Sequence, residues 1–208
     1  MTDTTMPAPK SRPEDSIDRF IARLDDLKMR GDRAALAKLR RSLVDYGRDF
    51  SAYTVLGYAL PPNVPPRQLD LYLLVAGLFA MHPLAASDDT SFAWSLRRLR
   101  AAREGVGESS LDALAGAILN ADGEDIPIRL RHVIARLAAD GIPVDYRRLL
   151  RDLLKWESVS RHVQRRWARD YYVGRAADGE QPGDAAADGG EENAGDAATS
   201  PVPAATAV

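Results

Sequence analysis

The chain has 208 residues, which is enough for one domain or for two small domains in contact. The absence of cysteine excludes disulfides and thiolate metal sites, and the longest apolar run, residues 71–81, is too short for a membrane span of about 20 residues. The formal net charge of −2 conceals two unlike parts, because residues 1–173 hold 27 bases and 23 acids whereas residues 174–208 hold one base and seven acids.

Apolar residues recur at helical spacing through the first 83 residues. The pattern predicts a first helix that starts near Pro13, a second helix capped by Asp32, a third over residues 50–60 and a buried fourth over residues 67–81. The proline cluster at residues 61–66 separates the third helix from the fourth, since proline can continue neither a helix nor a central strand.

The same period continues in the second half of the chain. Asp88 or Asp89 is expected to cap a helix that ends before Gly105, and another helix covers residues 111–119. A further helix follows the turn at residues 122–127 and closes at Gly141. Two more helices are expected, one capped by Asp145 and a last one capped by Ser158, with Val159, Val163 and Trp167 on one apolar line.

These elements predict an all-α protein with two helical lobes, at residues 13–83 and 88–173. Residues 1–12 are expected to be flexible; they are polar and lack the apolar segment of a secretory signal, so we expect a cytoplasmic protein with no membrane partner. The segment 174–208 has no aromatic residue and is rich in Ala, Gly, Asp and Glu. Such a composition cannot bury enough apolar surface to offset its ordering entropy, so we expect a disordered acidic tail.

The sequence offers no recognisable catalytic or metal-binding motif. The three histidines, His82, His132 and His162, have no second histidine at the i+3 or i+4 position that would complete a zinc pair on a helix. The acids near residue 124 lack the ligand spacing of a calcium loop, and the glycines around Val106 follow a helix rather than a strand, unlike a phosphate loop. We therefore expect a protein that is not an enzyme and needs no cofactor.

Arginine greatly outnumbers lysine, 24 to four. A GC-rich genome would produce the same ratio, so the positions of the bases are more informative than their number. The bases form stripes at helical spacing. The stripes comprise Lys38, Arg40 and Arg41; Arg97, Arg98, Arg100 and Arg103; Arg129, Arg131, His132 and Arg136; Arg147, Arg148, Arg151 and Lys155; and Arg161, Arg165 and Arg169.

Repeated cations along a path suit contacts with the phosphates of a nucleic acid, which need no side chain that reads bases. Residues 97–173 hold 15 bases against 11 acids, which favours this interpretation over solvated helix faces of balanced charge. Two alternatives remain open. One is a helical scaffold whose arginines meet acidic protein partners; the other, a helix-turn-helix regulator, lacks the expected polar recognition helix.

The order and spacing of several segments resemble CasB, the small subunit of the type I-E CRISPR surveillance complex called Cascade. The similarity runs from about Asp32 to Tyr172. The segments that carry it are 33–41, Leu96-Arg97-Arg98-Leu99, 130–137, 142–156 and Arg165-Arg166-Trp167-Ala168-Arg169-Asp170-Tyr171.

The resemblance implies a two-lobed helical protein without catalytic activity. Two copies would sit beside the other Cascade subunits, along the backbone that carries the crRNA. There the family helps to hold the guide–target duplex and the displaced strand of the target DNA through basic surfaces. The acidic tail is not part of the family pattern.

The resemblance transfers most directly to Arg40, Arg41 and Arg131, while His132 replaces a second arginine of the family motif. The start of the helix with Arg97 departs from the commoner family pattern. Together, the resemblance and the stripes give the expected nucleic-acid-binding set. This set is Arg40, Arg41, Arg97, Arg98, Arg100, Arg129, Arg131, Arg136, Arg147 and Arg151.

Overall fold

A computed structural model describes residues 13–43, 50–87, 89–103 and 107–174. These residues are helical apart from turns, connections and one isolated bridge between Ala85 and Val144, which confirms the predicted all-α class. The chain divides into a unit that ends at Arg175 and a second unit from Ala176, and all described residues belong to the first. The predicted flexible N-terminus and, apart from Gly174, the predicted acidic tail lie outside the described residues.

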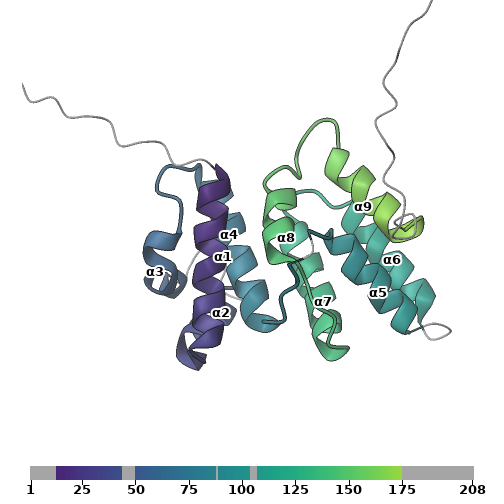
Figure 1. The fold of residues 1–208 in the computed structure, drawn as a ribbon. Coiled ribbons are helices and arrows are strands. Elements are labelled where there is room, and N and C mark those ends of the chain that lie inside the picture. The colour runs from purple at the N-terminus through teal and green to yellow at the C-terminus, as the bar shows by residue number, and fades with distance from the viewer. Residues whose placement is uncertain (1–12, 44–49, 88, 104–106, 175–208) are drawn as a thin grey trace, which may run out of the picture. The chain divides into compact units, whose positions relative to one another are not determined.

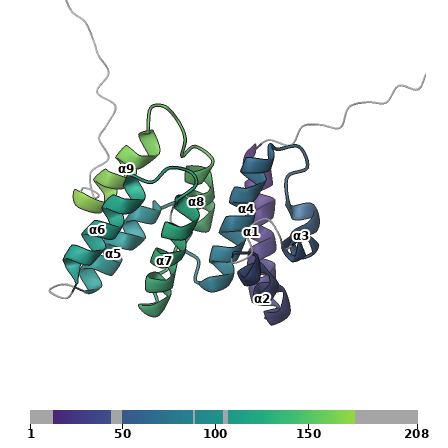
Figure 2. The same ribbon diagram turned by 180° about the vertical axis from the view of Figure 1, so that it is seen from behind.

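The four helices predicted before residue 83 are all present (Figures 1 and 2). They are α1 (Pro13–Met29), α2 (Arg33–Ser42), α3 (Ser51–Leu56), which continues as a 3₁₀ turn at Gly57–Ala59, and α4 (Pro66–Met81). The predicted cap of α2 is confirmed, since Asp32 Oδ1 accepts a hydrogen bond from the Ala35 amide at 2.9 Å. The last proline of the cluster occupies the first position of α4, where its missing N–H costs nothing.

Helix α4 is the central element of this half, and eight of its residues are buried. Tyr72 packs edge-on against Phe20 of α1 with ring centroids 5.0 Å apart. On another side, α2 packs closely against α4. Gly77 makes this approach possible, because a Cβ at that position would clash with the side chain of Leu43. The small residue therefore sets where the basic end of α2 lies.

The five helices predicted after residue 88 are also present. They are α5 (Phe92–Ala102), α6 (Glu108–Leu119), α7 (Ile126–Ala139), α8 (Tyr146–Leu153) and α9 (His162–Tyr172). Asp145 caps α8 as predicted, through its Oδ1 and the Arg148 amide at 2.8 Å. The core of this half includes Trp167, which is 1% exposed and packs between Phe92 and Trp156.

Two predicted helix caps are wrong. Asp89 adopts a left-handed conformation, with φ of 52°, and its carboxylate pairs with Arg148 instead, so α5 begins after Ser91. Ser158 also fails to cap a helix, because a further turn follows it and α9 begins only after Arg161, which has φ of 47°. Val159 is consequently fully exposed rather than part of the apolar line. Asp88 and Gly105 lie outside the described residues.

The connection between the two halves is fastened to the segment that precedes α8. The buried His82 ring lies 2.7 Å, through Nε2, from the Ile142 carbonyl, and the Tyr146 hydroxyl donates to the His82 carbonyl at 2.6 Å. Val144 exchanges two backbone hydrogen bonds of 3.0 Å with Leu84 and Ala86. These bonds, together with packing of α4 on α7 and α8, join the halves into one unit.

A buried carboxylate joins α8 to α9. Asp152, 3% exposed, accepts a hydrogen bond from Trp167 Nε1 at 2.6 Å and another from Arg166. The Arg148 Nε lies 3.2 Å from the same carboxylate. Since a buried charge is tolerated only when it is paired and hydrogen-bonded, Asp152 and its three partners form one interdependent cluster.

We predict that Asp152→Ala lowers the free energy of unfolding by about 3 to 5 kcal/mol, because it leaves the Arg166 guanidinium and the Trp167 N–H without their buried acceptor. Chemical denaturation followed by tryptophan fluorescence measures this change. The matched control is Asp140→Ala, which removes the partly exposed pair with Arg103 and should cost less than about 1 kcal/mol. Equal effects of the two substitutions would contradict the structural role of Asp152.

Burial raises the pKa of the Tyr146 hydroxyl well above its ordinary value of about 10. Below about pH 10 the Tyr146 hydroxyl is protonated in both the folded and the unfolded chain, so it adds no pH dependence to the free energy of unfolding. Above about pH 10 only the unfolded chain releases this proton, so Tyr146 lowers the free energy of unfolding by about 1.4 kcal/mol for each further pH unit.

We predict that Tyr146→Phe is less stable than the original chain at neutral pH but loses stability less steeply between about pH 10 and 11. Urea denaturation at each pH measures both effects.

Candidate nucleic-acid interface

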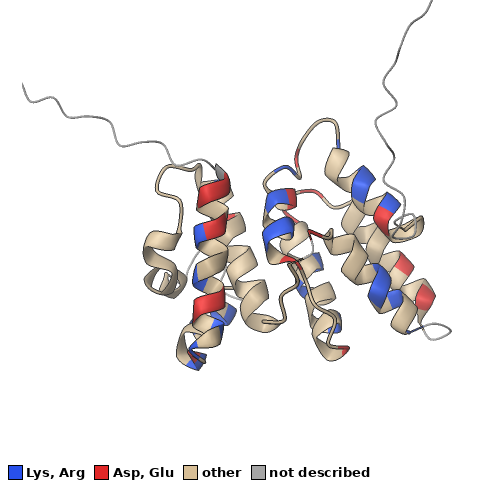
Figure 3. Cartoon of the chain, in the orientation of Figure 1, with Lys and Arg blue, Asp and Glu red and all other residues tan. Residues whose placement is uncertain are grey.

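The structure separates the predicted basic residues into those paired with carboxylates and those that are not. Figure 3 shows acidic and basic segments side by side on several helices, including α1 and α8. This distinction matters because a guanidinium already held by a carboxylate must lose that partner before it can bind a phosphate. The pairing of each candidate therefore determines which surface is available to a polyanion.

The stripe on α8 faces acids of α1 and of the connection before α5. Arg147 pairs with Asp18, and Arg151 Nη2 lies 2.7 Å from Glu14 Oε2. Arg148 Nη1 lies 2.9 Å from Asp89 Oδ2. The α8 bases thus hold α1 against α8, although their side chains are only partly buried.

The candidates on α5 and at the start of α7 also have partners within the chain. Arg100 Nε lies 3.0 Å from Asp112, and Arg129 pairs with Asp125 one turn before it at 2.9 Å. Arg97 donates to the Tyr171 carbonyl at 2.8 Å and lies over the Trp94 ring. Arg97 therefore connects α5 to the end of α9.

Six of the ten candidates form no ion pair with a carboxylate among the described residues. One of them, Arg97, is held by the Tyr171 carbonyl. The other five are Arg40 and Arg41 at the end of α2, Arg98 on α5, and Arg131 and Arg136 on α7. Of these five, all except the half-buried Arg136 are exposed. Both views of the fold show α5 apart from α2, so Arg98 does not join the other four (Figures 1 and 2).

A groove of about 720 Å³ brings α2 and α7 together, and we call it the α2–α7 groove. Its lining includes Leu43, which caps α2, and Met81, the last residue of α4, together with Arg131 and His132 of α7. The remaining lining residues are Glu124, Pro127, Ile128 and Ala135. Arg40 and Arg41 lie in the last turn of α2, which ends at Ser42.

The chemistry of this groove favours contacts with phosphate groups. Arginine offers a planar set of N–H donors that matches phosphate oxygens. The lining contributes Arg131 and His132 from α7, together with the acid Glu124, and Arg40 and Arg41 lie in the last turn of α2, which is capped by the lining residue Leu43. Among the described residues that line the groove there is no Phe, Tyr or Trp, and the imidazole of His132 is the one ring on which a base could stack. Within the described part of the chain, no three or more His, Cys, Asp or Glu side chains gather into a group that could hold a metal ion.

The sequence did not predict that the apolar side chains of Leu43, Met81 and Ile128 would line a groove. Ile128 is 62% exposed and lies outside the apolar stripe that runs from Leu130 to Leu137 along α7. That misplaced position was the available signal, because an apolar residue on the polar face of a helix is unusual near a basic surface. Leu43 and Met81 gave no such signal, since each continues the apolar spacing of the helix that it ends.

Comparison with known proteins relates the chain to one family of CRISPR-associated proteins. A family model described as CRISPR-associated protein Cse2 matches residues 35–172. CRISPR-associated protein Cse2 from Thermus thermophilus is 47% identical over 75 residues, which are 36% of this chain and 43% of that relative. The aligned part thus spans less than half the length of this curated relative.

Several solved structures share the fold. A Cse2-family protein from Thermus thermophilus superposes with a TM-score of 0.65 and 32% identity, covering 76% of this chain and 97% of its own. CasB from M. ruber gives a TM-score of 0.62 and 30% identity, covering 74% and 93%. A chain of a CRISPR RNA-guided surveillance complex, at a TM-score of 0.65 and 24% identity over 77% and 94%, is similar in fold. Among the described residues, no helix combines the length and the hydropathy required to cross a membrane.

We predict that Glu14→Gln with Asp18→Asn lowers the free energy of unfolding by less than about 1 kcal/mol for each pair, because both carboxylates are half exposed and solvent screens the interaction. Raising the salt concentration should remove the difference between this variant and the original chain. Urea denaturation at low and high salt checks both points. A loss of several kcal/mol that persists in high salt would contradict weak, surface-type pairing.

Proposed function

The chain belongs to the Cse2, or CasB, family of CRISPR-associated proteins, and from this premise we propose that it is a non-catalytic small subunit of a type I-E Cascade surveillance complex. In this role it acts in the cytoplasm in antiviral defence and assembles with the other Cascade subunits and with a second copy of itself. It contacts the crRNA, the target DNA and the displaced strand, and it stabilises the R-loop.

We assign the phosphate contacts first to the α2–α7 groove. The observation that supports this assignment is that Arg131 lines the groove together with Leu43, the residue that caps α2, while Arg40 and Arg41 lie in the last turn of that helix. None of these three arginines pairs with a carboxylate among the described residues. Arg136 follows one turn after His132 and extends the basic surface along α7. Cations from two helices can follow a nucleic-acid backbone, because successive phosphates need only charge and donors along a path.

This arrangement fits a division of labour in which base pairing with the guide reads the sequence and protein side chains hold the backbone. The described residues that line the groove include no Phe, Tyr or Trp and no Asn or Gln, the amide side chains that commonly read base edges. We therefore propose that binding through the groove is independent of base sequence.

We expect the arginines that already pair with carboxylates to contribute less to phosphate binding. Arg147 and Arg151 are engaged by α1 carboxylates, and Arg100 and Arg129 by acids near them in sequence. A phosphate contact at any of these positions requires exchange of the carboxylate for the phosphate. The gain in free energy is smaller there than at an unpaired guanidinium, because the existing charge interaction is lost.

The test is charge reversal of the three groove bases in one variant, Arg40→Glu, Arg41→Glu and Arg131→Glu. In a reconstituted complex that contains the variant, target DNA should be retained more weakly. A plot of the logarithm of the binding constant against the logarithm of the salt concentration has a negative slope. In the variant this slope should be shallower by about three, one for each lost phosphate contact. Filter binding between about 50 and 200 mM salt measures this slope.

The matched control reverses three other exposed bases, Arg19, Lys155 and Arg169, which lie on α1, after α8 and on α9 rather than on α2 or α7. It changes the net charge by the same amount, so retention closer to that of the original chain would assign the effect to the groove. A groove variant that assembles normally and retains DNA as the original does would refute the proposed contacts. That outcome would favour a helical scaffold that binds proteins only.

A further inference from the structure

Two ion pairs join the start of α1 to α8, and we call them the α1–α8 pairs. Arg147 pairs with Asp18, and Arg151 donates through Nε to Glu14 Oε2 at 2.9 Å, while its Nη2 lies 2.7 Å from the same oxygen. The side chains of Asp18 and Glu14 are 50% and 60% exposed, against 40% and 29% for the two arginines. Solvent therefore reaches the carboxylates, and each arginine holds an anion that an external anion can replace.

The fold does not depend on these two pairs. Helix α1 packs through an apolar face that includes the buried residues Ile17, Phe20 and Leu24, so it stays in place when the pairs open. Ion pairs that are exposed to this degree contribute little to stability, because solvent screens them. Rotation of the acidic side chains is thus enough to free both arginines.

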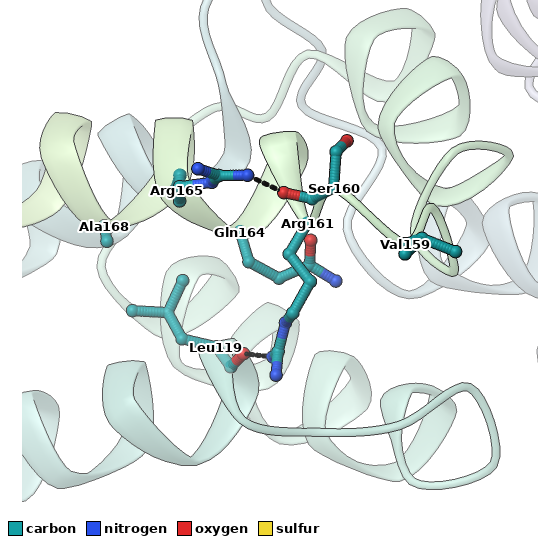
Figure 4. Close-up of a pocket in the computed structure, with 7 residues that line it drawn as sticks. All are labelled: Leu119, Val159, Ser160, Arg161, Gln164, Arg165 and Ala168. Atoms are coloured by element: carbon teal, nitrogen blue, oxygen red, sulfur yellow. Dashed lines mark hydrogen bonds between the residues drawn. The ribbon is translucent and has the colours of Figure 1, made fainter.

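Arginines at the start of α9 are held in a different way. Arg161 donates to the Leu119 carbonyl at 2.7 Å, and Arg165 donates to the Ser160 carbonyl (Figure 4). A carbonyl oxygen carries no net charge, so these guanidinium groups keep their positive charge. The carboxylates of α1, in contrast, compensate the charge of the α8 arginines as well as occupying their donors.

A hollow of about 590 Å³ lies beside the α1–α8 pairs. Arg147 and Arg151 both line it, and Lys28 of α1 adds a third base. An external group that enters the hollow therefore meets three cations from two helices, two of which the acids of α1 hold.

The acids that line the same hollow are mostly engaged elsewhere. Asp89 Oδ1 and Oδ2 accept hydrogen bonds from Arg148 Nη1 at 3.0 and 2.9 Å, and Asp145 Oδ1 accepts from the Arg148 amide as the cap of α8. Asp25 is the third acid of the lining. Once the carboxylates of α1 turn away, the bases of the hollow outweigh the acid that is left.

The resident carboxylates indicate which external anion can displace them. A carboxylate of a partner protein carries the same charge, and it competes with Glu14 and Asp18 at the high effective concentration of groups within one chain. A nucleic acid instead brings a row of phosphates, whose condensed counterions are released when bases neutralise them. The planar donors of arginine also match phosphate oxygens. The exchange thus favours a nucleic acid over an acidic protein.

We propose that Arg147 and Arg151 form a second phosphate site, which Glu14 and Asp18 mask in the free chain. The acids of α1 lower the affinity of the chain for nucleic acid in general. Where phosphates are concentrated, as beside a polynucleotide already held in the complex, they replace the carboxylates. The inference rests on the proposed role in nucleic-acid binding and adds to it a site that α1 regulates.

The experiment measures binding of the full chain to a fluorescein-labelled DNA duplex of mixed sequence, by fluorescence anisotropy at about 50 mM salt. The unmasked variant carries Glu14→Gln and Asp18→Asn, which remove the charge of both acids and keep their size. The matched control carries Asp15→Asn and Asp70→Asn, two exposed acids that form no ion pair among the described residues. The unmasked variant should bind with an affinity at least about fivefold above that of the original chain, and the control within about twofold of it.

Two further variants show whether the gain comes from the arginines of α8. Addition of Arg147→Gln and Arg151→Gln to the unmasked variant should remove the gain, because the freed guanidinium groups are then absent. Addition of Arg165→Gln and Arg169→Gln instead removes two bases with the same one-turn spacing on α9 and should leave most of the gain.

An unmasked variant that binds no more tightly than the control would overturn the inference. So would a gain that survives the loss of Arg147 and Arg151. The variant with charge reversal at the α2–α7 groove, measured in the same assay, separates this inference from the proposed function. If the groove variant binds more weakly but the unmasked variant shows no gain, only the masking is refuted; if neither changes binding, the proposed function fails as well.

Discussion

The availability of each arginine depends on whether the fold places a carboxylate beside it. A guanidinium that is paired inside the chain contributes to packing, whereas one without such a partner contributes its field to the surface. Here the acids of α1 and the carboxylate of Asp89 form ion pairs with the arginines of α8. The end of α2 and the outer face of α7 are left with cations that no described carboxylate neutralises. The surface that we propose for nucleic acid follows from this selection among bases that look equivalent along the sequence.

The position of that surface depends on how the helices are fixed to one another. Gly77 lets Leu43 approach α4 closely, which sets the end of α2 at one side of the groove. On the opposite side, α7 is held by its packing against α4, while Tyr146 and Val144 fasten the connection that leads out of α4. A rigid framework of this kind holds separated cations at fixed spacing, so little side-chain and backbone freedom remains to be lost on binding.

Local sequence signals predicted most of the fold, because helix periodicity, proline breaks and the caps Asp32 and Asp145 each act over a few residues. The caps proposed for Asp89 and Ser158 failed where tertiary contacts or an additional turn replaced the local rule. The candidate site was less predictable. Arg147 and its partner Asp18 are 129 positions apart, and no pattern within a helix reveals such a pair. Stripes of arginine therefore indicated a class of function but not which stripe is free.

The proposed phosphate contacts and the charge pairs inside the chain respond differently to salt. Contacts to phosphates release counterions from the nucleic acid, so affinity at the α2–α7 groove is expected to fall steeply with salt. The pairs that Arg147 and Arg151 form with α1 are partly exposed and contribute little to stability, so their screening costs the fold little. The buried Asp152 cluster is screened much less, because solvent ions do not reach it. The chain can therefore keep its fold under conditions that release a bound nucleic acid.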